Sequence, residues 1–187
     1  GRPGAVLVDI TKDVTIKKGD YKPQVPEVIE RRSYTYPTET IKKAIQMIEK
    51  SERPFVFVGG GAIAAGASEE LKEFVEKIDA PVADSLMGKG AYDGTNPRYT
   101  GMLGMHGTKT SNLGVSRCDL FIVVGARFSD RVTGNTAKFA RNAKIIHIDV
   151  DAAEINKNVA VDLGIVGDAK SILGALNLLL AQQNHPQ

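Results

Sequence analysis

A strand-like apolar run that ends in three glycines constrains this chain more than any other feature. The apolar run covers Pro54–Val58, and a segment with helical character, Ala67–Ile78, follows the glycines closely. Glycines without a Cβ atom let the backbone approach a bulky anion, and the free N–H groups of a following helix point toward it. The spacing of Gly59, Gly61 and Ala64 fits the G-x-G-x-x-G/A fingerprint of dinucleotide sites. Such a run is equally often only a tight strand-to-helix turn.

The composition is that of a globular protein. Its 187 residues suffice for one well-buried domain, and a formal net charge of +2 gives no sign of a nucleic-acid groove or a membrane-binding basic face. No apolar run approaches the ~20 residues of a membrane span. The single cysteine, Cys118, excludes an internal disulfide framework and suits a reducing compartment, so a cytoplasmic protein is expected.

The first 37 residues differ in character from the rest. Residues 5–10 form an apolar run that predicts a buried strand with no preceding cap or helix, which suggests a domain cut from a longer protein. Residues 15–37 carry several prolines and lysines with little periodicity, which is typical of a linker. We therefore expect the last strand of a preceding domain within 1–14, a linker over 15–37 and one main domain over 38–187.

Amphipathic helices and short apolar strands alternate over the main domain. Helical patterns occur at 38–50, with Thr38 as the expected N-cap, and at 68–78, 108–117 and 169–181. Strands are predicted at 54–58, 81–84, 119–124, 143–149 and 159–166, with a short helix near 152–157. Alternation at this spacing predicts right-handed βαβ units. The expected fold is α/β and Rossmann-like, with a parallel sheet flanked by helices on both faces.

The predicted strand ends carry residues suited to a ligand. In an open parallel sheet, ligands bind at the carboxyl ends of the strands. Five strand ends carry glycine, a small polar residue or a charge: Gly59–Gly61, Ser85–Met87, Gly125–Arg127, Asp149 and Gly167–Asp168. A sheet without a ligand needs turns and caps there, but not so many residues suited to close approach. The pattern therefore favours a dinucleotide-like ligand.

The charged residues near these ends each have two interpretations. Arg127 and Arg131 could bind diphosphate oxygens in the bidentate way a guanidinium allows, or pair with Asp130 or another surface acid. Asp149 could accept hydrogen bonds from ribose hydroxyls, or cap the helix that follows it. The glycine fingerprint alone favours a nicotinamide cofactor, with Asp84 at the next strand end as the ribose acceptor.

The glycine-rich loop near residue 105 is similarly ambiguous. His106 could donate to the edge of a ring or be a polar turn residue, and Met102, Leu103 and Met105 suit a flat ring, a core or an interface. Three histidines and one cysteine, without metal-ligand spacing, give no nucleophile with its base and no metal site. The sequence therefore predicts binding, not catalysis by this chain alone.

Several motifs together resemble one enzyme family. They are GRPG at 1–4, VDITKDV at 8–14, VGGG at 58–61, LMG at 86–88, MLGMHG at 102–107, GARFSDRVTG at 125–134 and HIDVDAAEINKN at 147–158. In this order they resemble the acetolactate synthase (acetohydroxyacid synthase) large subunit, a thiamine-diphosphate-dependent enzyme. The resemblance covers the family's central domain, a linker and the last strand of its N-terminal pyrimidine-binding domain. The family's catalytic glutamate and its magnesium–diphosphate motif are not among the matched residues.

The resemblance implies a function for a longer parent protein. Such enzymes are transferases that decarboxylate pyruvate and add the two-carbon unit to pyruvate or 2-oxobutanoate, in valine, leucine and isoleucine synthesis. Thiamine diphosphate and Mg²⁺ serve that chemistry outside this chain, whereas the central domain holds FAD in a largely structural role. The implied partners are the other domains of the same subunit, a second copy in a homodimer or homotetramer, and a small regulatory subunit. No nucleic acid or membrane partner is implied.

By similarity, the FAD contacts fall on loops at the strand ends. They are Arg2, Gly59, Gly60, Gly61, Ser85, Leu86, Met87, Leu103, Gly104, Met105, His106, Gly125, Ala126, Arg127, Arg131, Val132, Asp149, Val150, Gly167 and Asp168. Four residues resemble positions around the channel to the active site: Lys12, Met105, Asp130 and Arg131. Ser129 stands where the family usually has a second aspartate that contacts the flavin nucleotide. The resemblance makes the ligand FAD, lying across several strand ends.

Two alternatives stay open on the sequence alone. One is a structural central domain of a related thiamine-diphosphate enzyme without flavin, and Arg2, His106 and Arg127 argue against an empty cleft. The other is a nicotinamide-dependent dehydrogenase domain, which the lack of a proton-donor constellation disfavours.

Overall fold

The computed structural model describes residues 4–25 and 36–181. The chain divides into two units, Gly1–Ser33 and Tyr34–Gln187. In the first unit, the described residues are exposed and contain one short helix, α1 (Lys12–Ile16). Residues 5–10 belong to no helix or strand of this chain, and their assignment to the last strand of a preceding domain stays a prediction. A strand needs a neighbour for its backbone N–H and C=O groups, and the neighbour expected for this run belongs to the preceding domain.

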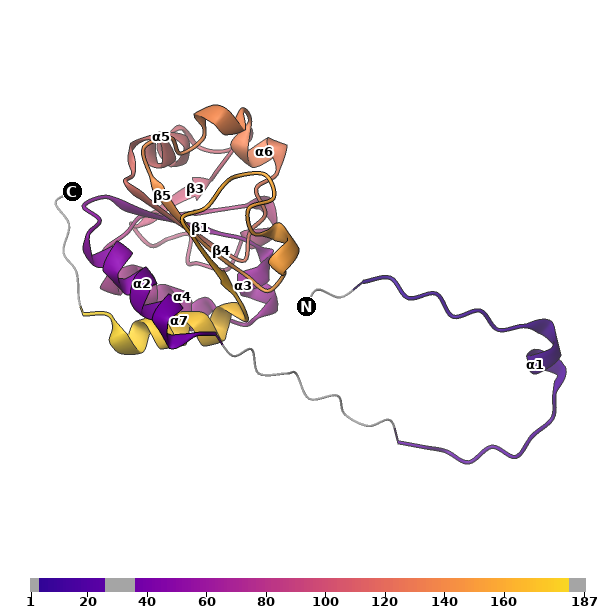
Figure 1. The fold of residues 1–187 in the computed structure, drawn as a ribbon. Coiled ribbons are helices and arrows are strands. Elements are labelled where there is room, and N and C mark those ends of the chain that lie inside the picture. The colour runs from indigo at the N-terminus through magenta and orange to yellow at the C-terminus, as the bar shows by residue number, and fades with distance from the viewer. Residues whose placement is uncertain (1–3, 26–35, 182–187) are drawn as a thin grey trace. The chain divides into compact units, whose positions relative to one another are not determined.

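The second unit is built around a six-stranded parallel sheet (Figure 1). Its strands are β1 (Pro54–Val58), β2 (Val82–Asp84), β3 (Tyr99–Met102), β4 (Leu120–Val124), β5 (Lys144–Asp149) and β6 (Leu163–Val166). The spatial order is β3-β2-β1-β4-β5-β6, which is the strand order of the Rossmann fold. The expected fold class is therefore confirmed.

The helices of this unit are α2 (Thr38–Glu49), α3 (Gly60–Ala64), α4 (Ser68–Lys77), α5 (Lys109–Arg117), α6 (Asp130–Thr133) and α7 (Ala169–Leu179). Short 3₁₀ turns occur at η1 (Leu86–Gly88), η2 (Thr136–Lys138) and η3 (Ala152–Glu154). Helices α2, α4 and α7 cover one face of the sheet, and α5 with residues 126–140 covers the other (Figure 1). Both faces of the sheet are therefore buried, as a parallel sheet requires.

Side chains that alternate along each strand divide the core into two layers. Val56 and Val58 of β1 pack against α2, α4 and α7, whereas Phe55 and Phe57 face α5. The α5 side is rich in aromatic residues, and the rings of Phe57 and Phe121 are stacked with centroids 6.0 Å apart. Because all five residues of β1 are buried, the continuous apolar run seen in the sequence is the signature of a central parallel strand.

Sequence patterns missed the edge strand β3 and misplaced one helix cap. Strand β3 has the sequence YTGM and is half-buried, so it shows no apolar run. Thr38 is not the N-cap of α2, because the carbonyl of Pro37 already accepts the N–H groups of Thr40 and Ile41. The helix therefore starts one residue earlier than expected.

A carboxylate joins the two segments that lead into the central strands. The side chain of Asp119, just before β4, accepts hydrogen bonds from the Ser51 hydroxyl and from the N–H groups of Glu52 and Arg53, just before β1. Burial alone would raise the pKa of the Asp119 carboxyl, but these hydrogen bonds and nearby Arg53 hold that pKa below its ordinary value. The charged form is thus the one that the folded state favours.

Asp119→Ala is expected to lower the free energy of unfolding at pH 7 by roughly 1–3 kcal/mol, since it leaves three donors without their acceptor. Because the folded-state pKa is depressed, this stabilisation is present above the unfolded-state value of about 3.9 and is lost as pH falls through the folded-state pKa. Urea unfolding between pH 7 and pH 2 measures both effects. Glu39→Ala, which removes an exposed surface pair, is the control and should cost less than about 1 kcal/mol. Equal losses for the two variants would contradict this role of Asp119.

Candidate functional site

The loops that follow the strands lie along one edge of the sheet, which we call the carboxyl edge. It comprises residues 59–64, 85–88, 103–107, 125–134, 149–151 and 167–168. All six strands are parallel, so their carboxyl ends point the same way. The register places Val58 of β1 beside Asp84 of β2 and Val124 of β4, so these three strands end level with one another.

Backbone hydrogen bonds connect four loops of the carboxyl edge to neighbouring strand ends. Four N–H groups that follow a strand donate to the end of the adjacent strand: Ser85 to the Val58 oxygen, Leu103 to Asp84, Gly125 to Ile148 and Gly167 to Asp149, at 2.8–2.9 Å. Gly60, Leu103, Arg127 and Asp149, which are far apart in sequence, therefore lie on one edge. This is the arrangement that a ligand lying across several strand ends requires.

Gly59 and Gly61 of the fingerprint are needed for the close packing of the loop after β1 against the loop after β4. A Cβ atom on Gly59 would lie 2.3 Å from the carbonyl oxygen of Gly125, and one on Gly61 would lie 2.7 Å from the Gly125 Cα. The N–H of Gly61 also donates to that same oxygen at 2.9 Å. Gly125 itself has φ +57°, a conformation that favours glycine. The fingerprint is thus explained in part by loop contact, whatever ligand is bound.

The loop after β3 is held against the loop after β4. The N–H of Met105 donates to the carbonyl oxygen of Arg131 at 2.8 Å, and a Cβ atom on Gly104 would lie 2.4 Å from that oxygen. The side-chain amide of Asn112 in α5 makes two hydrogen bonds to the backbone of Gly104. It accepts from the Gly104 N–H at 3.1 Å and donates to the Gly104 carbonyl oxygen at 3.0 Å. Sequence reasoning missed Asn112, because one amide on a helix carries no pattern that marks it.

Large apolar side chains are exposed at the carboxyl edge. Leu86, Met87 and Met105 have exposed fractions of 71%, 75% and 68%. Side chains of this kind usually face a ligand or another protein surface when they gather on one edge. Their chemistry suits a flat apolar ring, and it equally suits contact with a further domain.

The predicted cationic residues differ in their partners. Arg131 lies 3.5 Å from the Asp130 carboxylate, and both side chains are largely exposed. The surface pair considered for Arg131 is therefore formed, and such a pair contributes little to stability. Arg127 is exposed and makes no ion pair with any residue in the described ranges, so its guanidinium is available to an anion. His106 is also exposed.

Acidic side chains of the carboxyl edge accept hydrogen bonds from backbone N–H groups. Asp149 is buried, and its carboxylate accepts the N–H of Asp151 at 2.9 Å and lies 3.8 Å from His147. Asp151, not Asp149, caps the short turn η3. Asp168 caps α7 by accepting the N–H of Ser171 at 3.0 Å. The carboxylate of Asp149 is thus directed into the protein, while its backbone lies at the edge.

Asp84, the ribose acceptor of the nicotinamide interpretation, has protein partners. The Tyr99 hydroxyl donates to its carboxylate at 2.7 Å, and the Lys89 ammonium lies 3.7 Å away. Burial, followed by the hydrogen bond to Asp84, raises the pKa of Tyr99, so the hydroxyl keeps its proton as a donor. With only 3% of Asp84 exposed, this carboxylate is poorly placed to receive a ribose. The geometry disfavours the nicotinamide interpretation.

Two of the predicted site residues do not belong to the second unit. Arg2 lies outside the described residues, and Lys12 belongs to α1 of the first unit. In the described parts of the chain, no cluster of three or more His, Cys, Asp or Glu side chains could hold a metal ion. No helix among them is long and apolar enough to cross a membrane.

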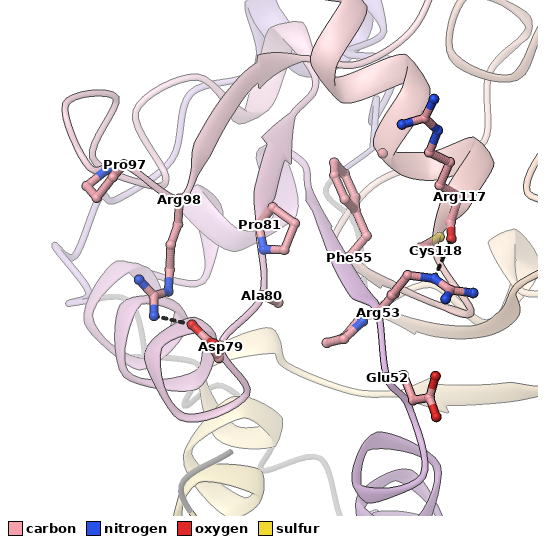
Figure 2. A pocket seen from close by; sticks show the side chains of 12 residues that line it. Glu52, Arg53, Phe55, Asp79, Ala80, Pro81, Pro97, Arg98, Arg117 and Cys118 are labelled. Atoms are coloured by element: carbon pink, nitrogen blue, oxygen red, sulfur yellow. Dashed lines mark hydrogen bonds and ion pairs between the residues drawn. The ribbon is translucent and has the colours of Figure 1, made fainter. Parts of the chain in front are cut away.

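A cavity of about 360 Å³ lies at the opposite edge of the sheet, where β1, β2 and β3 begin (Figure 2). We call it the amino-edge cavity. Its lining includes Arg53, Phe55, Pro81, Arg98 and Arg117. None of the residues predicted to contact FAD lines it. Ligands of open parallel sheets bind at the carboxyl ends of the strands, so the carboxyl edge stays the candidate dinucleotide site.

Known proteins resemble this chain closely. The family model described as "Thiamine pyrophosphate enzyme, central domain" matches residues 41–176. The acetolactate synthase large subunit of Haemophilus influenzae is 47% identical over 178 residues, which are 92% of this chain and 31% of that protein. The acetolactate synthase isozyme 3 large subunit of Escherichia coli is 45% identical over 193 residues, covering 100% of this chain and 33% of that protein.

A solved structure has the same fold. It is that of "a putative thiamin diphosphate-dependent enzyme isolated from Mycobacterium smegmatis", with a TM-score of 0.69 and 25% identity, covering 86% of this chain and 31% of that one. The chain thus spans about a third of the length of the proteins it resembles.

Gly59→Ala and Gly174→Ala are expected to change stability in opposite directions. The first adds a Cβ atom 2.3 Å from the Gly125 oxygen and should lower the free energy of unfolding by about 1–3 kcal/mol. The second adds a methyl group within α7 with nothing within 4 Å, and should raise it by about 0.5–1 kcal/mol. Chemical denaturation of both variants measures the difference. A Gly59→Ala protein as stable as the parent would contradict the close packing of the two loops.

Proposed function

Because the chain belongs to the thiamine pyrophosphate enzyme central-domain family, we propose that it is the FAD-binding central domain of an acetolactate synthase large subunit. The parent would condense pyruvate with pyruvate or 2-oxobutanoate, with loss of CO₂, in branched-chain amino-acid synthesis. Thiamine diphosphate and Mg²⁺ would bind outside this chain, which alone would not be catalytic. Its relatives are named large subunits, which supports a small regulatory partner, and we expect a homodimer or homotetramer in the cytoplasm.

The observation that carries the flavin assignment is the convergence of six loops on the carboxyl edge. FAD is a long molecule with a flat apolar ring at one end and a diphosphate near its middle, so it needs a rim with different chemistry along its length. The exposed apolar side chains of Leu86, Met87 and Met105 suit the ring. The exposed guanidinium of Arg127 suits the diphosphate.

The backbone of the carboxyl edge supports the same assignment. A Cβ atom on Gly60 would lie 3.0 Å from the Met87 oxygen. Glycine at this position therefore leaves no side chain projecting from the surface between β1 and β2. FAD would have a largely structural role, because the condensation belongs to thiamine diphosphate. Met105, Asp130 and Arg131 would border the substrate channel, together with Lys12.

Arg127→Ala is expected to weaken FAD binding about tenfold, which corresponds to the loss of one charge-assisted hydrogen bond. Arg117→Ala is the matched control: it removes the same charge from another exposed arginine, but at the amino edge, and should leave FAD affinity unchanged. The measurement is a titration of the purified chain with FAD, followed by flavin fluorescence. Equal FAD affinities for the two variants would refute the assignment of Arg127.

The same titration separates the remaining interpretations. If only the full-length parent binds FAD saturably, the site needs neighbouring domains. If neither the chain nor the parent binds FAD, the domain is a structural module without flavin. Saturable binding of NAD in place of FAD would favour a dehydrogenase domain.

A further inference from the structure

We propose that the amino-edge cavity binds a small apolar monocarboxylate at a site separate from the carboxyl edge. The cavity lies where β1, β2 and β3 begin, next to the last turn of α5. Its volume of about 360 Å³ lies within the range of small-molecule sites, roughly 300–1,000 Å³.

The walls of the amino-edge cavity are apolar and stiff. Pro54, Pro81 and Pro97 line it together with the ring of Phe55, and Figure 2 shows Pro81 between Arg98 and Phe55. The Phe55 ring can lie against α5 only because position 114 is glycine: a Cβ atom there would be 2.3 Å from the ring. Rigid apolar walls lose little conformational entropy when they bind a flat or branched apolar group.

The charged side chains around these walls leave a net positive charge. Three arginines and two acids are among the lining residues. Arg98 pairs with Asp79, which neutralises one arginine, and the buried Nε of Arg98 has no hydrogen-bond partner. Figure 2 shows the carboxylate of Glu52 directed away from Phe55 and Pro81. The lining residues thus carry one cationic charge in excess, which matches a ligand with a single negative charge.

Arg53 and Arg117 have terminal N–H groups that remain available. The Nε of Arg53 donates to the backbone carbonyl of Arg117 at 3.0 Å, which fixes the Arg53 side chain at the end of α5. Asp119 also lies near Arg53, but its oxygens accept Ser51 and backbone N–H groups. The Arg117 guanidinium makes no ion pair with any described residue. A carboxylate accepts two parallel hydrogen bonds from a guanidinium, which favours it over other monoanions.

Cys118 adds no negative charge to the cavity. Burial, followed by nearby Asp119, raises the pKa of its thiol to about 12, and the thiol lies 3.3 Å from the Val115 carbonyl oxygen. The thiol is therefore neutral at physiological pH, and it serves as part of the apolar wall. The recognition elements are then the apolar walls and the arginines among the lining residues, as an apolar carboxylic acid requires.

The test is calorimetric titration of the 187-residue chain with 2-naphthoate, with neutral 2-naphthamide as the probe of the same shape. We expect 2-naphthoate to bind saturably and at least about tenfold more tightly than 2-naphthamide, since only the acid can accept charge-assisted hydrogen bonds. Saturating FAD should leave the affinity for 2-naphthoate unchanged. In a ¹⁵N–¹H spectrum, the acid should shift the amide signals of Gly114 and Cys118.

Arg117→Ala and Arg53→Gln should each weaken 2-naphthoate about tenfold. Arg141→Ala, which removes another exposed arginine that does not line the cavity, should not change it. The proposal is overturned if 2-naphthoate does not bind, if the amide binds as tightly as the acid, or if all three variants lose affinity equally. Loss of 2-naphthoate binding on addition of FAD would also overturn it. Because FAD binding is measured separately at the opposite edge, each of these failures leaves the flavin assignment standing.

Discussion

The contact between the glycine turn after β1 and Gly125 after β4 is the constraint on which the rest of the carboxyl edge depends. At this point the strand order reverses, and the two loops approach so closely that no side chain fits between them. The N–H of Gly61 closes the contact by donating to the Gly125 oxygen. Hydrogen bonds from neighbouring loops to adjacent strand ends extend this single contact into a continuous rim.

The two edges of the sheet have different chemistry. All strands begin at the amino edge and end at the carboxyl edge, so different loops form each one. At the amino edge, prolines and arginines surround a cavity, and Asp119 secures the entry segments of β1 and β4. At the carboxyl edge, the glycines carry no side chains that would project from the surface, whereas the side chains of Leu86 and Met105 are exposed there. One parallel sheet can therefore offer an extended rim for a dinucleotide and a compact cavity for a small acid.

Much of the fold could be predicted from the sequence, and so could the edge that carries the candidate site. Continuous apolar runs such as Pro54–Val58 identify central parallel strands, and glycines after them identify the strand ends. The half-buried strand β3 was missed because its pattern is set by tertiary contacts, not by hydrophobicity. The apolar run at 5–10 was predicted as a strand, but strand formation depends on a partner that sequence cannot supply. The Asp149 carboxylate points into the protein, and the Asn112 side chain holds Gly104 by hydrogen bonds. Both depend on side-chain geometry, which residue spacing in the sequence does not predict.

The central claim is that these loops jointly bind one flavin nucleotide, and hydrogen–deuterium exchange of the chain with and without FAD tests it most directly. When FAD is bound, amides at 59–61, 103–107 and 125–127 are expected to exchange more slowly, with no change at 52–55 or 97–98. Slower exchange confined to the amino edge, or no change at the carboxyl edge while FAD is bound, would contradict it.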